Sequence, residues 1–84
     1  MSEYYFTFQS LTAAQRAAFA LTKEGIAVQI VRAPKPLSDY GCSYAIRIPS
    51  EFRSKTAQFL FENRIPWERA FYVSTNSRAE EVWF

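Results

Sequence analysis

The 84-residue chain uses one order of elements twice, and this repeat constrains its fold more than any other feature. A β-prone segment at 4–8 precedes an Ala-rich helical segment at 11–24, and a β-branched segment follows at 26–31. The same strand, helix and strand then recur with an offset near 39 residues, which places Ile26 over Ile65. The sequence therefore predicts two β-α-β units in succession.

Two right-handed β-α-β units joined in this way predict an α+β fold of ferredoxin-like topology. Such a β-α-β-β-α-β sandwich has a four-stranded antiparallel sheet with both helices on one face. The predicted strands are 4–8, 26–31, 43–48 and 65–73, and the predicted helices are 11–24 and 51–62. We assign residues 1–75 to this domain and residues 76–84 to a short C-terminal tail.

The helix ends are predicted from residues that cap or terminate helices. Ser10 and Ser50 are the expected N-caps, because a serine hydroxyl accepts a hydrogen bond from a free backbone N–H. Gly25 and Asn63 are expected to end the helices in left-handed geometry. The buried stripe of the first helix should contain Leu11, Ala14, Ala18 and Leu21, and one face of the first strand should carry Tyr4, Phe6 and Phe8.

We further expect the first and third strands to begin, and the second and fourth to finish, at the same end of the sheet. This arrangement would bring the tail close to Cys42. The three apolar residues at 82–84 should be covered, since each large apolar side chain gains about 1.5–3 kcal/mol on burial. They would cover the open sheet face against Tyr5 and Ala45, or cross to a partner's sheet, and we favour the homodimer.

One cysteine and no histidine restrict the chemistry that this chain supports. A single cysteine forms no internal disulfide, and the sequence has neither a Cys–His nucleophile pair nor a common zinc ligand set. We therefore expect no metal, no cofactor and no enzyme activity.

Charge and hydropathy indicate a soluble, cytoplasmic protein. Ten Lys and Arg against eight Asp and Glu give a net charge of +2, which is too small to indicate nucleic acid or an anionic membrane. No apolar run approaches the roughly 18 residues of a membrane span, and the first residues lack the pattern of a secretory signal. We expect neither nucleic acid nor membrane as a partner.

The candidate functional site is the segment around Cys42. Pro34 and Pro36 fix two φ angles and stiffen the chain before it, and Gly41 permits a turn that a side chain would resist. A thiol becomes reactive when nearby cations stabilise its thiolate. The sequence therefore favours this loop as the place where chemistry would occur.

Three basic residues are candidates to stabilise a Cys42 thiolate. They are Arg32, Lys35 and, if its side chain leans back along the strand, Arg47. With these charges the pKa of the thiol is expected below the roughly 8.5 of a free cysteine. An alternative stays open, because free cysteine is among the most buried residue types and often serves as a small hydrophobic residue.

Four stretches carry a family resemblance: YYFTFQS at 4–10, KEGI at 23–26, VRAPKPLS at 31–38 and CSYAIRI at 42–48. Together they make the region 4–73 resemble the selenium/sulfur carrier-like family of small bacterial domains. The resemblance implies a thiol that carries sulfur or selenium at Cys42, with Lys35, Ser38 and Arg47 at matching positions. The family usually has glycine directly after the cysteine, whereas here glycine precedes it.

The leading interpretation is a small thiol carrier or accessory protein that holds sulfur or selenium as a persulfide-type adduct. Its partners would be a sulfur or selenium donor or acceptor protein. The alternative is a non-catalytic interaction or dimerisation module that acts through its sheet face and tail. An RNA-binding domain of the same topology is a third interpretation, but the strand at 43–48 lacks the expected aromatic pair beside Tyr5.

Overall fold

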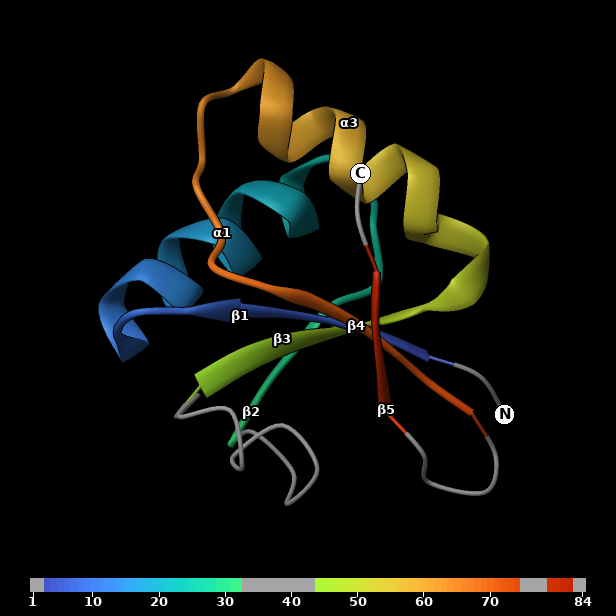
Figure 1. The fold of residues 1–84 in the computed structure, drawn as a ribbon. Helices are drawn as coiled ribbons and strands as arrows, with labels where there is room; N and C mark the ends of the chain where they lie inside the picture. The colour runs from blue at the N-terminus through green and yellow to red at the C-terminus, as the bar shows by residue number, and fades with distance from the viewer. Residues whose placement is uncertain (1–2, 33–43, 75–78, 83–84) are drawn as a thin grey trace.

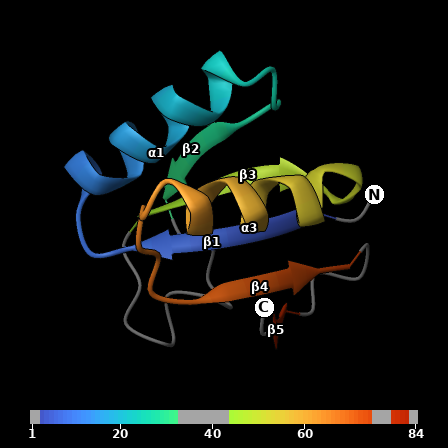
Figure 2. The same ribbon diagram turned by 90° about the horizontal axis from the view of Figure 1, so that it is seen from above.

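A computed structural model describes residues 3–32, 44–74 and 79–82 of the chain (Figure 1). The elements are β1 (Glu3–Phe8), α1 (Leu11–Lys23), β2 (Gln29–Arg32), β3 (Tyr44–Pro49), a 3₁₀ turn (Ser50–Phe52), α3 (Arg53–Glu62), β4 (Ala70–Val73) and β5 (Ala79–Val82). The strands form one antiparallel sheet in the order β2-β3-β1-β4-β5. Both helices lie on one face of this sheet (Figures 1 and 2). The predicted α+β class is therefore confirmed.

The prediction of four strands is wrong, because the described residues contain five. Residues 79–82, which we had assigned to a tail over the sheet face, pair antiparallel with β4 from Ala70↔Val82 to Val73↔Ala79. Without this partner the outer backbone N–H and C=O groups of β4 would stay unpaired at the sheet edge. The segment thus extends the sheet sideways, which explains why it does not lie against Tyr5 and Ala45.

The predicted strand directions are wrong for β1 relative to β3, although β2 finishes where β3 begins, as predicted. Phe8 pairs with Tyr44 and Glu3 pairs with Pro49, so β3 begins where β1 ends. Since β2 and β3 are antiparallel neighbours, β3 reverses the direction that β1 and β2 share. Val73 pairs with Glu3, so the chain leaves β4 at the end of the sheet opposite to Tyr44. Cys42 itself lies outside the described residues.

The start and end of α1 follow the sequence prediction. The Ser10 hydroxyl accepts a hydrogen bond from the Ala13 N–H at 3.1 Å. Gly25 has a φ of +79°, and the Ile26 N–H donates to the Leu21 carbonyl at 3.1 Å. This 6→1 bond after a left-handed residue is a Schellman motif.

The ends of α3 differ from the prediction. The 3₁₀ turn at Ser50–Phe52 precedes the helix, and neither element has a side-chain N-cap bond. At the other end Arg64, with a φ of 55°, is the left-handed residue, whereas Asn63 has a φ of −96°. The Asn63 amide donates to the Phe59 carbonyl at 2.9 Å, and the Ile65 N–H donates to the Leu60 carbonyl at 2.9 Å. Both helices thus end in the same motif.

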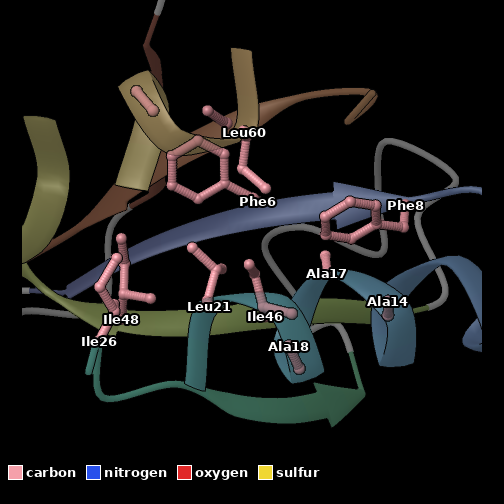
Figure 3. Packing of buried hydrophobic residues seen from close by; sticks show 12 residues of the cluster. Phe6, Phe8, Ala14, Ala17, Ala18, Leu21, Ile26, Ile46, Ile48 and Leu60 are labelled. Atoms are coloured by element: carbon pink, nitrogen blue, oxygen red, sulfur yellow. The ribbon is translucent and has the colours of Figure 1, made fainter. Parts of the chain in front are cut away.

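The main core lies between the sheet and the helices (Figure 3). Phe6 and Phe8 of β1 pack there with residues of β3 and both helices, as the predicted alternation requires. In α1 the buried positions are Ala14, Ala17, Ala18 and Leu21. Ala17 takes the place expected for Leu11, which is 39% exposed, because positions 14, 17, 18 and 21 share one helix face.

A second cluster lies on the face of the sheet away from the helices. It consists of Tyr5, Ala45 and Phe71, with Val31 and Val73 packed against it. Thr7 is also fully buried, and its hydroxyl accepts from the Arg69 N–H at 3.0 Å and donates to the Arg69 carbonyl at 3.2 Å. The central strand β1 is therefore buried on both faces.

Candidate functional site

The segment that carries the cysteine joins β2 to β3. Its predicted site residues Pro34, Lys35, Pro36, Ser38, Gly41 and Cys42 lie outside the described residues. The described residues on either side of it are Arg32 and Tyr44, which are Cα partners in the β2–β3 ladder. The segment therefore leaves and re-enters the sheet at one place, the end where β1 finishes.

Arg32 is the predicted site residue that the structure places at this end. It is the last residue of β2, which forms an edge of the sheet among the described strands, and it is exposed. Its guanidinium forms no ion pair within 4.0 Å with a described residue. An exposed cation without a partner carboxylate is available to an incoming anion.

Arg47 lies farther along β3, and its contacts differ from those of Arg32. Its Nε is 3.4 Å from Glu3 Oε2, and its Nη2 donates a hydrogen bond to Gln29 Oε1. The three residue steps from Tyr44 to Arg47 correspond to about 10 Å along a strand. The structure thus does not bring Arg47 and Arg32 together, and a role for Arg47 at Cys42 stays a prediction.

Sequence reasoning missed the group formed by Glu3, Gln29 and Arg47. These residues border a pocket of about 540 Å³ beside Thr22 of α1 and Pro49 of β3. The correct strand directions would have revealed the group, since an acid at the start of β1 then lies beside a base near the end of β3.

The open sheet face does not present exposed rings on β1 or β4. Tyr5 is 7% exposed and Phe71 is fully buried. Recognition of single-stranded RNA on such a sheet needs accessible aromatic rings on which bases stack. These two rings are therefore part of a core and provide no stacking surface.

No group of three His, Cys, Asp or Glu side chains in residues 3–32, 44–74 and 79–82 is placed to hold a metal ion. Within these ranges, neither helix combines the length and apolar character that a membrane span requires.

The fold and the position of the cysteine define a small α+β domain with its one cysteine in the connection between two antiparallel strands. A protein family described as "Putative Se/S carrier protein-like" matches residues 3–72, and the chain belongs to this family. The resemblance found in the sequence is thereby confirmed. No curated protein and no solved structure matches the chain.

Proposed function

We propose that this protein carries one sulfur or selenium atom on the thiol of Cys42. The observation that carries this proposal is the family match, which spans residues 3–72 and so includes Cys42. Since the chain has no other cysteine, a thiol-bound chalcogen has a single site of attachment. We further propose that β1–β4 and the two helices form a ferredoxin-like arrangement, which β5 extends, and that the protein acts in the cytoplasm, where thiols stay reduced.

The loading step is an exchange between a thiolate and a persulfide. The Cys42 thiolate attacks the terminal sulfur of a persulfidated thiol on the donor, and a new S–S bond forms while the donor S–S bond breaks. The donor leaves as a thiolate and takes up a proton, so no external oxidant or reductant is consumed. The same exchange with a donor selenopersulfide would load selenium, and attack by an acceptor thiolate would unload the carrier.

Arg32 and Lys35 stabilise the anionic forms of this cycle. Both the free thiolate and the persulfide anion gain from a nearby cation, and Arg32 has no ion-pair partner among the described residues. Pro34, Pro36, Ser38 and Gly41 shape the loop. Arg47 has a secondary role, because its guanidinium already contacts Glu3 and Gln29.

The mass of the intact protein tests the proposal. Freshly purified protein should have a mass one sulfur atom above that of the sequence, or should reach this mass after incubation with a small-molecule persulfide. A thiol reductant should remove the added sulfur. Incubation with a selenopersulfide should add one selenium atom in the same way. Cys42→Ser should abolish both additions, while the matched neighbour variant Ser43→Ala should retain them. A wild-type mass that stays unchanged after both incubations would refute the carrier function.

A further inference from the structure

The most exposed large apolar side chain of the described residues lies at the end of α3. Phe61 is 79% exposed, and with Leu60, Arg64, Ile65, Pro66 and Trp67 it lines a hollow of about 340 Å³. The end of α3 and the chain that follows it run beside α1 in both views (Figures 1 and 2). We call this region the Phe61 surface, and we define it by Arg16, Phe61, Glu62, Arg64, Ile65, Pro66, Trp67 and Glu68.

The apolar centre of the Phe61 surface is anchored on the core. Trp67 is half-buried, and its ring meets that of Phe6 edge-on at a centroid distance of 5.4 Å. Ile65 is half-buried as well, and its N–H closes the Schellman motif at the end of α3. The centre is therefore a preformed platform, and a partner would not have to order it on binding.

Exposed large apolar residues elsewhere in the described structure do not form such a group. Phe19 is 66% exposed, but the Lys23 ammonium lies over its ring at 4.8 Å. Leu11 and Ile30 are 39% and 40% exposed and lie on different elements. Scattered apolar residues are normal on a monomer, whereas a group of them marks a contact surface.

The charges around the apolar centre are balanced in sign. Arg16 and Arg64 line a second hollow of about 280 Å³ with Ile65 and Pro66, and Glu68 lines a third beside Trp67. Glu62 follows Phe61 and accepts a hydrogen bond from the Gln58 amide. None of these two arginines and two glutamates forms an ion pair within 4.0 Å with a described residue.

We propose that the Phe61 surface is the two-fold interface between two copies of this chain. A two-fold axis puts the same surface on both sides, so the surface must complement itself. An apolar centre flanked by two cations and two anions meets this requirement, because each copy's arginines can face the other copy's glutamates. If a partner presented charges of one sign only, either the two arginines or the two glutamates of this surface would face like charge. The inference holds whether or not Cys42 carries a chalcogen.

Sedimentation equilibrium of the full chain over a range of concentrations tests the interface. We expect a wild-type dimer, and we expect Phe61→Asp to weaken it by at least about tenfold in Kd, since an unpaired carboxylate would enter the apolar centre. Phe19→Asp is the matched control, because it introduces the same charge at an exposed phenylalanine outside the surface. It should leave the Kd unchanged.

Circular dichroism checks that both variants are folded. Because both side chains are exposed, both variants should keep the wild-type spectrum. A wild-type monomer throughout the concentration range would overturn the proposal. An equal loss of dimer in the two variants would overturn it as well, because the contact would then not be specific to the Phe61 surface.

Discussion

Arg32 and Tyr44 are partners across β2 and β3, the last residue of one strand and the first of the other. The cysteine-bearing connection therefore starts after the exposed Arg32 and finishes before its ladder partner Tyr44. This relationship gives Arg32 a fixed position relative to both ends of the connection, and it makes Arg32 the described residue whose substitution best tests the thiol chemistry.

We expect the Cys42 thiol to have a pKa below the roughly 8.5 of a free cysteine. Arg32→Ala should raise this pKa, by on the order of half a unit for an exposed pair, because loss of the cation removes stabilisation of the thiolate and not of the thiol. The pH dependence of the alkylation rate measures the change. Lys55→Ala on α3 removes an exposed cation from another part of the chain and should leave the profile unchanged. A cysteine that reacts only after denaturation would instead be a buried structural residue.

We expect no measurable binding to mixed single-stranded RNA at physiological salt. A surface that recognises phosphates loses affinity steeply with salt and needs accessible stacking rings, whereas Tyr5 and Phe71 are buried. Fluorescence anisotropy with a labelled oligonucleotide provides the measurement. Tight, salt-dependent binding would show that another surface of the chain recognises RNA.

Truncation after Thr75 should destabilise the protein by about 1–3 kcal/mol. It removes β5, the contact of Val82 with the main core and the 3.3 Å ion pair between Arg69 and Glu81. Urea unfolding measures the loss. Glu81→Gln, which removes only the exposed ion pair, should cost no more than about 1 kcal/mol. An unchanged midpoint after truncation would mean that β5 contributes nothing to stability.

The truncated chain also separates two routes to a dimer. Because residues 79–82 pair with β4 of their own chain, we expect the truncated protein to dimerise through the Phe61 surface as the full chain does. Sedimentation of both proteins compares them. A monomeric truncated protein beside a dimeric full chain would favour the exchange of tails between sheets.

The two Schellman motifs allow a matched pair of substitutions. Gly25→Ala should destabilise by about 1 kcal/mol, because its φ of +79° disfavours a side chain although no atom lies within 4 Å of the added Cβ. Arg64→Gly should raise the stability of the protein by somewhat less than this, since Arg64 adopts a φ of 55°, which glycine adopts more readily. Thermal unfolding at a concentration below dimer formation measures both. The opposite sign for either variant would contradict this account of the helix ends.

Features that depend on neighbours in the chain were predictable. Ser10, Gly25 and the alternation through Phe6 and Phe8 each act within a few residues, so a local pattern is sufficient. The prediction for Asn63 was wrong because this residue keeps a φ of −96° while its side-chain amide donates to the Phe59 carbonyl. The next residue, Arg64, adopts the left-handed conformation instead.

Features that depend on pairing between distant segments were harder to predict. The short segment 79–82 has no sequence pattern that distinguishes an edge strand from a tail. It becomes a strand because it pairs with the outer edge of β4. The error in strand direction placed Glu3 at the opposite end of the sheet from Arg47 in the prediction, although Arg47 contacts both Glu3 and Gln29. For the candidate site, the sequence located the cysteine and Arg32 but not the partners of Arg47.

Burial of β1 on both faces determines where the chain tolerates change. Four successive residues of β1 are buried: Tyr5, Phe6, Thr7 and Phe8. The Thr7 hydroxyl also hydrogen-bonds to the Arg69 backbone. We therefore expect every position in this window to restrict substitution. β2 is the opposite case, since three of its four residues are exposed. A saturation mutagenesis screen for folded protein should find its least permissive window at residues 5–8 and a permissive strand at residues 29–32. The two strands of the first β-α-β unit, central β1 and edge strand β2, thus differ in how much sequence change they can accept.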